Sequence, residues 1–363
     1  MKGKKKNKVV KIVSISVITI SVLTIAAVLA LTWRPFREGG NAITLSGTTS
    51  KISAVATSSN QQAWSGNTAN FLVCGIDKTN LLTDVIMVIS FNNQTGKISM
   101  LQIPRDTYAG PDVISQKYNA IYGHPPKGVS GMEYLKARIQ LDFGIKIDHY
   151  LALTTNGFDN LVNSVGGIDF YVPITMNYDD SAQDLHIHLK KGFQHLNGNQ
   201  AEQFVRDRHS WAQGDIGRLQ AQKSFLAAFA AKLKKQSLIT LTTHVLPTIM
   251  PPNFKTDMTT LQMLEFGLAA KKVDLSKVTV YTSPGTSYID PSNKLSYYTI
   301  YKDQLVNILN KSFVASGENL TVDDIKIEQR VSSPSSSTSS ESSGDNFQDL
   351  YNSSQSKSSS SKK

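Results

Sequence analysis

A cluster of arginines between positions 206 and 222 is the feature most suggestive of chemistry. Five side chains within these 17 residues are the candidates: Arg206, Arg208, Asp215, Arg218 and Gln222. The planar guanidinium of arginine binds two phosphate oxygens at once, and Arg218 and Gln222 are spaced to share one face of a helix. The segment therefore predicts a site for a multi-oxygen anion such as pyrophosphate, although a solvated charged face has the same composition.

Two aspartates are placed to bind a hard cation. Asp77 follows one apolar run and Asp84 opens the next, with a six-residue loop between them. Carboxylates at adjacent strand ends can converge, and Mg²⁺ prefers such oxygen ligands together with water and phosphate. Asp77 and Asp84 are therefore candidate ligands for Mg²⁺, and either could instead accept a proton from a reacting hydroxyl. Acids that merely cap turns are the alternative.

Two further basic residues stand beside these acids in the sequence. Arg105 lies in the segment IPRDT, directly after an apolar run, which can place its side chain at the end of a sheet. Lys117 begins the segment KYNAIYG and could meet a phosphate. A surface turn for Arg105 and a core role for the aromatic residues beside Lys117 are the alternatives.

Other common kinds of site are missing from the sequence. His186 and His188 are spaced to share one face of a strand and His195 is near, but no adjacent acid or cysteine completes a usual zinc set, so we do not expect zinc. Cys74 is the one cysteine and lies in an apolar run, which predicts a buried thiol and excludes an intrachain disulfide. Neither a Gly-x-Ser-x-Gly elbow nor a phosphate-binding P-loop occurs.

The elements that must position these residues alternate between strands and helices. Periodicity and turn residues predict a mixed central β-sheet flanked by helices, an α/β or α+β fold. The predicted strands cover residues 70–76, 84–91, 97–103, 149–153, 168–172 and 278–282, with a hairpin turn at 92–96, and the predicted helices cover residues 131–143, 158–165, 199–206, 216–235, 261–272 and 302–311.

The N-terminal residues predict a membrane anchor. Residues 1–11 contain six lysines and no acid, and residues 12–33 are uncharged and apolar. As a helix, 22 such residues span about 33 Å, enough for a bilayer core. The lysines then stay in the cytoplasm and the rest of the chain lies outside the cell, unless the segment is a cleaved signal peptide. Six of the ten net positive charges belong to residues 1–11, so we expect no nucleic-acid partner.

Beyond the anchor, composition divides the chain into three parts. Residues 34–69 are rich in Ser, Thr, Asn and Gly and predict a linker. Residues 70–331 predict one folded extracellular domain. Residues 332–363 contain 16 serines among 32 residues and predict a disordered tail.

Several segments together resemble the LytR-CpsA-Psr family over residues 70–233. They occur in the order NFLVCGID, TDVIMVIS, ISMLQIPRDTY, KYNAIYGH, VGGIDFYV, GFQHLNGNQAEQFVRDRH and DIGRLQAQ, after one apolar stretch. The resemblance implies a membrane-anchored phosphotransferase of Gram-positive bacteria. Such enzymes move a glycopolymer (wall teichoic acid, capsular or similar polysaccharide) from its undecaprenyl-pyrophosphate carrier to peptidoglycan through a phosphodiester. It also implies a mixed sheet between helices with an apolar channel for the carrier.

The resemblance also implies roles for individual residues. Asp77 and Asp84 match the magnesium-associated acids, and Asp215 matches an acid associated with the pyrophosphate site. The residues that match the pyrophosphate-binding set are Arg105, Lys117, Arg206, Arg208, Arg218 and Gln222. The loop between the first two acids is shorter than is common in the family, and Ala221 stands where the family usually has arginine. Two rival functions remain open at this point, a non-catalytic surface protein that binds anionic polymer or carrier lipid with a regulatory role, and a lipid pyrophosphatase.

Overall fold

The structure is a computed structural model that describes most of the chain after residue 67. The described residues run from 68 to 355, except 78, 80, 93–94, 182–184, 213, 249–252, 261, 264–265, 268–272, 316 and 331–343. The predicted cytoplasmic tail and membrane helix, and residues 34–67 of the predicted linker, lie outside them. Among the helices that are described, none is both long and apolar enough to cross a bilayer.

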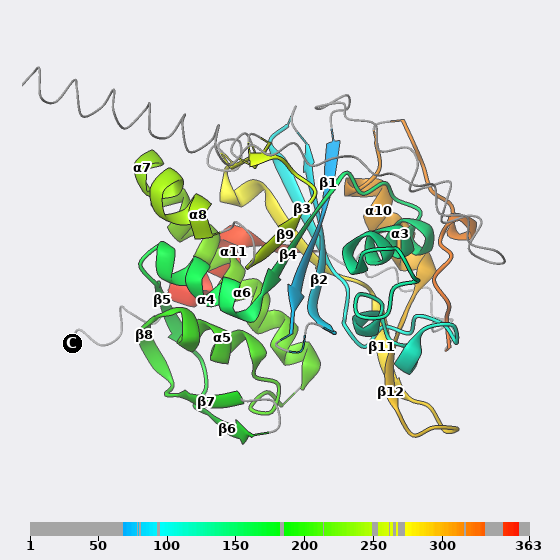
Figure 1. The fold of residues 1–363 in the computed structure, drawn as a ribbon, viewed down its shortest axis with the longest axis horizontal. Coiled ribbons are helices and arrows are strands. Elements are labelled where there is room, and N and C mark those ends of the chain that lie inside the picture. Colours follow the sequence, from blue (N-terminus) through cyan, green and yellow to red (C-terminus); the bar gives the residue numbers. More distant parts are fainter. Residues whose placement is uncertain are drawn as a thin grey trace, which may run out of the picture. The chain divides into compact units, whose positions relative to one another are not determined.

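A mixed seven-stranded sheet forms the centre of the domain (Figure 1), with the strand order β13-β10-β3-β2-β1-β4-β9. The pairs β1–β4 and β3–β10 are parallel, and the other neighbouring pairs are antiparallel. The strands are β1 (Thr68–Ile76), β2 (Thr83–Asn92), β3 (Lys97–Gln102), β4 (His149–Thr154), β9 (Phe254–Thr256), β10 (Val278–Thr282) and β13 (Asp345–Asn346). The predicted mixed sheet and the β2–β3 hairpin are confirmed.

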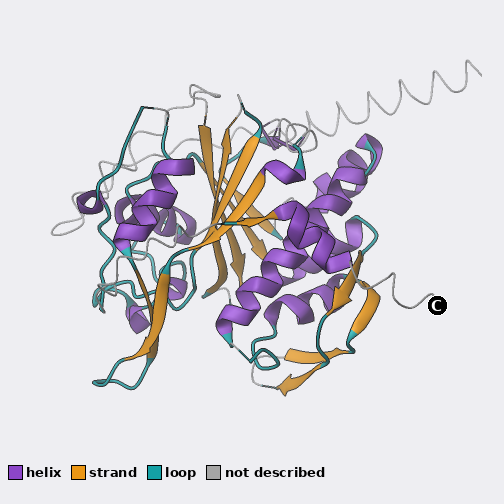
Figure 2. Ribbon diagram, turned by 180° about the vertical axis from the view of Figure 1, so that it is seen from behind, coloured by secondary structure: helices purple, strands orange, loops and turns teal. Residues whose placement is uncertain are grey.

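Helices cover both faces of this sheet, as Figure 2 shows from behind. On one face lie α3 (Gly131–Phe143) and α10 (Lys302–Ser312), and on the other lie α6 (Asp215–Lys235) and α11 (Phe347–Gln355). Alternate residues of each strand point to opposite faces. In β1, Leu72 therefore belongs to the core under α3 and α10, while the preceding Phe71 belongs to the core on the α6 and α11 face.

A second group of elements adjoins α6 and encloses its own core. Its helices are α4 (Thr155–Ser164) and α5 (Gly198–Arg206), and its aromatic centre includes Phe170, Phe204 and Phe225. Two small antiparallel sheets complete it, β5 (Ile168–Val172) with β8 (Gly192–Leu196) and β6 (Met176–Asp180) with β7 (Leu185–Leu189).

The remaining elements are short and lie around these two cores. A further hairpin pairs β11 (Gly285–Ile289) with β12 (Ser296–Ile300). The chain between α6 and β9 forms three consecutive turns, α7 (Leu238–Thr240), a π-helical turn (Leu241–Val245) and α8 (Leu246–Thr248). Single 3-10 turns occupy Ile114–Gln116, Tyr118–Ala120, Leu275–Lys277 and Val322–Asp324.

Local signals explain why α3 has the predicted bounds. The Ser130 side chain accepts a hydrogen bond from the Glu133 backbone N–H, and the Glu133 side chain accepts one in return from the Ser130 backbone N–H. This capping box satisfies two backbone donors that the helix itself leaves unpaired. Gly144 ends the helix with a φ of 67°, a left-handed conformation that suits glycine.

The C-terminal segment corrects one expectation. A disordered tail was predicted over 332–363, but residues 345–355 form β13 and α11. Asp345–Asn346 pairs with β10 at the sheet edge, and Phe347 is 1% exposed. Lys223 of α6, whose side chain is 3% exposed, donates to Asp345 over 2.8 Å. The prediction failed because the many serines of this segment outweigh its few apolar residues in the composition. Those apolar residues form one face of α11 that packs against the sheet and α6: Phe347, Leu350 and Tyr351.

Candidate active site

A pocket lies where β3 ends, β2 begins and the α5–α6 connection passes. Its lining contains one acid, four arginines and three other side chains: Asp84, Arg105, Tyr178, Leu185, Arg206, Arg208, His209 and Arg218. Five of the residues predicted to form the site therefore come together from four separate parts of the chain. Four guanidinium groups against one carboxylate make the lining strongly positive, which suits a multiply charged anion.

The sheet supplies an ion pair to this pocket. Asp84 is the second residue of β2, and Arg105 follows β3 by three positions. Because β2 and β3 are antiparallel, with Met87 opposite Gln102, the start of one strand lies beside the end of the other. Arg105 donates through Nη1 to Asp84 Oδ1 over 2.6 Å, and both side chains are only partly exposed.

The end of α5 supplies Arg206. This residue is the last of the helix, and its Nη1 lies 2.5 Å from Oε1 of Glu202, one turn earlier and buried. Gln222 of α6 donates through Nε2 to the carbonyl of Val205 over 3.0 Å. That carbonyl would otherwise lack a helical partner. Gln222 therefore fixes the end of α5 against α6, next to Arg206, and does not itself line the pocket.

A short turn presents Arg208 and His209. Asp207 is fully buried, and its Oδ1 accepts hydrogen bonds from the backbone N–H groups of His209 at 2.9 Å and Ser210 at 3.2 Å. This arrangement holds the turn by a side chain to backbone bond, as aspartate commonly does. Arg208 is exposed, and the ring of His209 stacks on Tyr178 of β6 with centroids 3.8 Å apart.

The first turn of α6 supplies Arg218, which is 2% exposed. Gly214 precedes the helix with a φ of 55°, a conformation that favours glycine. At Gly217, a Cβ atom would lie 2.5 Å from the Cβ of Trp211, so glycine is required for this close approach. The N-terminal end of a helix carries a partial positive charge, which adds to that of the arginines.

Besides Gln222, two predicted site residues are engaged outside the pocket, and the side chain of a third is not described. Asp77 Oδ1 accepts from the backbone N–H groups of Leu81 at 3.1 Å and Leu82 at 3.0 Å, so this carboxylate holds its own loop. Lys117 donates to Asp106 over 2.9 Å, and neither residue lines the pocket. Asp215 begins α6, and its side chain is not among those described.

Sequence reasoning missed three residues of the lining. His209 directly follows the Arg-Asp-Arg run, so its position was a usable signal. Tyr178 and Leu185 carried no such signal, because they reach the pocket only through the β6–β7 hairpin. Cys74 lies in the core at 1% exposure, and burial raises the pKa of its thiol, as expected for a structural cysteine.

The amino-acid sequence matches one family profile and several known transferases. The profile described as the LytR_cpsA_psr family matches residues 41–313. The polyisoprenyl-teichoic acid–peptidoglycan teichoic acid transferase TagV of Bacillus subtilis (strain 168) is 31% identical over 218 residues, which are 57% of this chain and 54% of TagV. The transferase TagU of Bacillus cereus (strain AH820) is 31% identical over 187 residues, 50% of this chain and 57% of TagU. The match thus spans little more than half of each relative.

Solved structures share the fold. The crystal structure of TagV from B. subtilis superposes with a TM-score of 0.56 at 25% identity, covering 68% of this chain and 95% of that one. The protein gbs0355 from Streptococcus agalactiae superposes with a TM-score of 0.57 at 22% identity, covering 76% of this chain and 92% of that one. The mixed sheet with helices on both faces is therefore an architecture common to these proteins.

Proposed function

The chain belongs to the LytR_cpsA_psr family, and from this membership we propose that it transfers a glycopolymer from an undecaprenyl-pyrophosphate carrier to peptidoglycan. The observation that carries the proposal is the convergence of Arg105, Arg206, Arg208 and Arg218 with Asp84 in one pocket. Two relatives, TagV and TagU, are named as teichoic acid transferases that use a polyisoprenyl-linked donor. The same pocket chemistry serves a wall teichoic acid, a capsular polysaccharide or a similar polymer.

In the proposed reaction the arginines hold the diphosphate of the carrier. A sugar hydroxyl of peptidoglycan attacks the phosphorus that bears the glycan, and the bond from that phosphorus to the bridging oxygen breaks. Undecaprenyl phosphate leaves, and a phosphodiester joins glycan to peptidoglycan. Since the donor is already activated, no ATP is consumed. Positioning and charge stabilisation by guanidinium groups supply most of the rate, as in other phosphoryl transfers.

Mg²⁺ is part of the proposal, and the chemistry of the pocket fits it. Asp84 is the carboxylate among the lining residues, and its present partner is the cation Arg105. Mg²⁺ in proteins commonly takes one or two carboxylates and completes its octahedron with water and phosphate oxygens. Asp84 would hold the ion, with Asp77 as the second acid of the pair. The ion would neutralise charge on the diphosphate.

We also propose that residues 12–33 anchor the protein in the cell membrane, with residues 1–11 in the cytoplasm and the catalytic domain outside. The apolar length of this segment and the six lysines before it support the topology. The partners are then the lipid-linked glycan, peptidoglycan and the membrane, and nucleic acid is not among them. A lipid-linked donor also requires an enzyme that works at the bilayer surface.

One assay tests the proposed function against its rivals. The purified full-length chain is incubated with a lipid-pyrophosphate glycan and Mg²⁺, with and without peptidoglycan. Glycan transfer that depends on peptidoglycan is expected. Release of glycan phosphate irrespective of the acceptor would instead identify a lipid pyrophosphatase. Donor binding without turnover would identify a non-catalytic binding protein, and either of these results overturns the proposal.

A further inference from the structure

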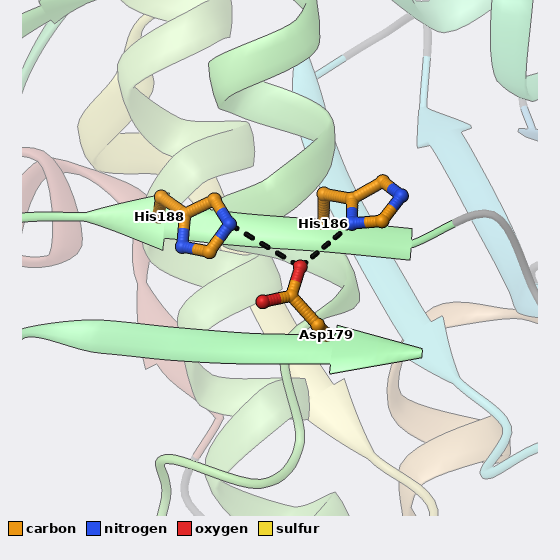
Figure 3. Close-up of side chains that lie close together, drawn as sticks. All are labelled: Asp179, His186 and His188. Carbon is orange, nitrogen blue, oxygen red and sulfur yellow. Dashed lines mark hydrogen bonds and ion pairs between the residues drawn. The ribbon is translucent and has the colours of Figure 1, made fainter. Parts of the chain in front are cut away.

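The outer face of the β6–β7 hairpin gathers three side chains outside the pocket. Asp179 of β6 and His186 and His188 of β7 lie together there (Figure 3). One potential ligand atom from each residue lies within 4.8 Å of the others, and all three side chains are exposed. The two histidines share a face of β7 as their spacing predicted. The third group comes from the neighbouring strand, which is why the sequence alone lacked it.

Cross-strand pairing creates the cluster. Asp179 stands opposite His186, and Asn177 stands opposite His188. His186 Nδ1 lies 2.6 Å from Asp179 Oδ1, and His188 Nε2 lies 3.2 Å from the same oxygen. The three groups therefore converge on one point between two strands.

Asn177 sets the tautomer of His188. The Nδ1 atom of His188 lies 2.7 Å from Oδ1 of Asn177. An amide oxygen only accepts hydrogen bonds, so Nδ1 carries a proton, and Nε2 is the ring nitrogen that faces Asp179 and is placed to ligate an ion. A histidine that ligates a metal is oriented in this way, by a hydrogen bond from its other ring nitrogen.

We propose that Asp179, His186 and His188 bind a transition-metal cation of the zinc class. Tetrahedral zinc with nitrogen and oxygen ligands at about 2.0–2.2 Å places those ligand atoms about 3.3 Å apart. The 3.2 Å between His188 Nε2 and Asp179 Oδ1 already matches that spacing. The His186 to Asp179 hydrogen bond lengthens by a rotamer adjustment at an exposed position. Two imidazoles and one carboxylate select zinc over magnesium, and water completes the fourth position.

A second histidine–aspartate pair shows what this cluster adds. His195 of β8 lies opposite Asp169 of β5, and its Nδ1 is 2.7 Å from Asp169 Oδ1, with both side chains about half exposed. This pair repeats the cross-strand contact of His186 and Asp179. It belongs to no group of three metal-ligating side chains among the described residues. One histidine and one aspartate are thus enough for a cross-strand hydrogen bond. In the β6–β7 hairpin a second histidine, His188, joins such a pair, and this third ligand is what points to a bound ion.

An ion bound at this cluster would also affect the arginine-rich pocket, because the same hairpin forms part of the pocket wall. Tyr178 and Leu185 point from the inner face of the same hairpin and line the arginine-rich pocket. A cation that joins β6 to β7 on the outer face fixes the strands that carry this wall. Zinc binding is a property of the hairpin itself and does not rest on the function proposed above.

The test is a zinc titration of the full-length chain, purified without a histidine tag. Isothermal titration calorimetry is expected to show one Zn²⁺ per chain, retained in excess Mg²⁺. His186→Ala and His188→Ala should each weaken binding at least tenfold, whereas the matched control His195→Ala should bind as the wild type does. X-ray absorption at the zinc edge should show imidazole ligands in the wild type.

The opposite results overturn the proposal. Zinc binding that persists at wild-type strength in the His186→Ala/His188→Ala double variant would place the ion elsewhere. So would loss of binding in His195→Ala. Absence of stoichiometric binding, or displacement by Mg²⁺, would show that the cluster is held by hydrogen bonds alone. Circular dichroism of each variant establishes that it is folded before titration.

Discussion

At the scale of single residues, the arginines of the pocket are not equivalent. Arg105 and Arg206 lie against carboxylates, and Arg218 is buried in the first turn of α6. Arg208 is exposed on a turn that Asp207 holds in place. Replacing Arg208 therefore tests anion binding with the least disturbance of the fold.

Arg208→Ala should lower glycan transfer about 10²-fold, because one preorganised donor to developing phosphate charge is commonly worth that much. The measurement is initial rate with a lipid-linked donor, together with the melting temperature. Arg330→Ala is the matched control, since Arg330 pairs with Asp290 outside the pocket. Equal transfer rates in the two variants would contradict the role of Arg208.

Asp84→Asn distinguishes a metal ligand from a proton acceptor. If Asp84 holds Mg²⁺, the variant should lose activity at low Mg²⁺ and regain much of it as the Mg²⁺ concentration rises, because an amide oxygen is a weaker ligand. The measurement is transfer rate against Mg²⁺ concentration. A loss that no Mg²⁺ concentration relieves would instead assign proton transfer to this carboxylate.

The same scale shows why some site residues were predictable and others were not. Arg206, Arg208 and Arg218 were found because their spacing around a helix start is local. Asp77 could not be assigned in the same way, since an acid before a short loop can either bind an ion or accept backbone hydrogen bonds, as its Oδ1 does here. Tyr178 and Asp179 depend on how two strands pair, which no local pattern records.

At the scale of elements, a buried ionic network joins α3 to its surroundings. Arg138 donates through Nε to Asp142 over 2.7 Å and through Nη2 to the carbonyl of Ala109 over 2.5 Å. Tyr118 donates its hydroxyl to the same Asp142. Burial raises the pKa of the Asp142 carboxyl, and the nearby Arg138 opposes that shift.

Arg138→Met should destabilise the protein by about 3–5 kcal/mol, because it leaves Asp142 buried without its cation. Urea unfolding followed by tryptophan fluorescence gives the value. Adding Asp142→Asn to that variant should recover part of the loss, since the uncompensated charge is then gone. If Arg138→Met lowers the free energy of unfolding by less than about 1 kcal/mol, the network contributes little to holding α3 in place.

Asp257 gives a pH dependence at the junction of β4 and β9. Burial acts to raise the pKa of its carboxyl, but the hydrogen bond with His149 and the charge of Lys136 outweigh burial and leave the pKa below its usual value. Its Oδ1 also accepts from the Tyr150 backbone N–H over 2.9 Å. A carboxyl with a lowered folded pKa contributes stability at neutral pH, and that stability disappears as pH falls through the lowered pKa.

Asp257→Asn should therefore reduce the free energy of unfolding by about 1–2 kcal/mol at pH 7, with a smaller difference from the wild type below about pH 3. Urea denaturation at both pH values measures the two differences. Asp349→Asn, at an exposed position of α11, is the control and should show neither. A difference that does not shrink in acid would contradict the charge-based explanation.

The elements themselves were largely predictable. Residues 131–143 were identified because Met132, Leu135, Ile139 and Phe143 follow helical spacing, and the caps at Ser130 and Gly144 give the helix the same ends. Residues 168–172 were identified as a strand that Pro173 stops. The bounds of α4 differed, since Thr154 caps a start three residues before the predicted one. Hydrophobic spacing predicted a later helix start, but the hydrogen bond from the Gly157 backbone N–H to the Thr154 side chain fixes the start at Thr155.

At the scale of the whole molecule, the folded unit extends beyond the family match, which ends at residue 313. Ile325 and Ile327 are buried in the core under α3 and α10, and Phe347 is buried on the opposite face. The predicted domain already included Ile325 and Ile327, but composition could not predict the burial of Phe347, because a few apolar side chains among many serines decide the outcome. The C-terminal segment therefore belongs to the domain.

Phe347→Ala should destabilise the protein by about 3–5 kcal/mol, the usual cost of removing a fully buried phenylalanine side chain. Ser353→Ala on the same helix is exposed and should change stability by less than about 0.5 kcal/mol. Thermal unfolding of both variants makes the comparison. Matching melting temperatures would show that α11 contributes little to the folded state.

The pairing of β13 with β10 also has a consequence for the order of events during synthesis. β10 lies next to the edge of the sheet, and among the described residues β13 is the strand that pairs with its outer side. While the ribosome is still adding those residues, the nascent protein exposes a row of unpaired amide and carbonyl groups, the kind of surface that recruits a foreign strand. Protection of this edge thus arrives with Asp345 and Asn346, and a chain truncated before them should leave β10 unpaired on that side and more prone to aggregate.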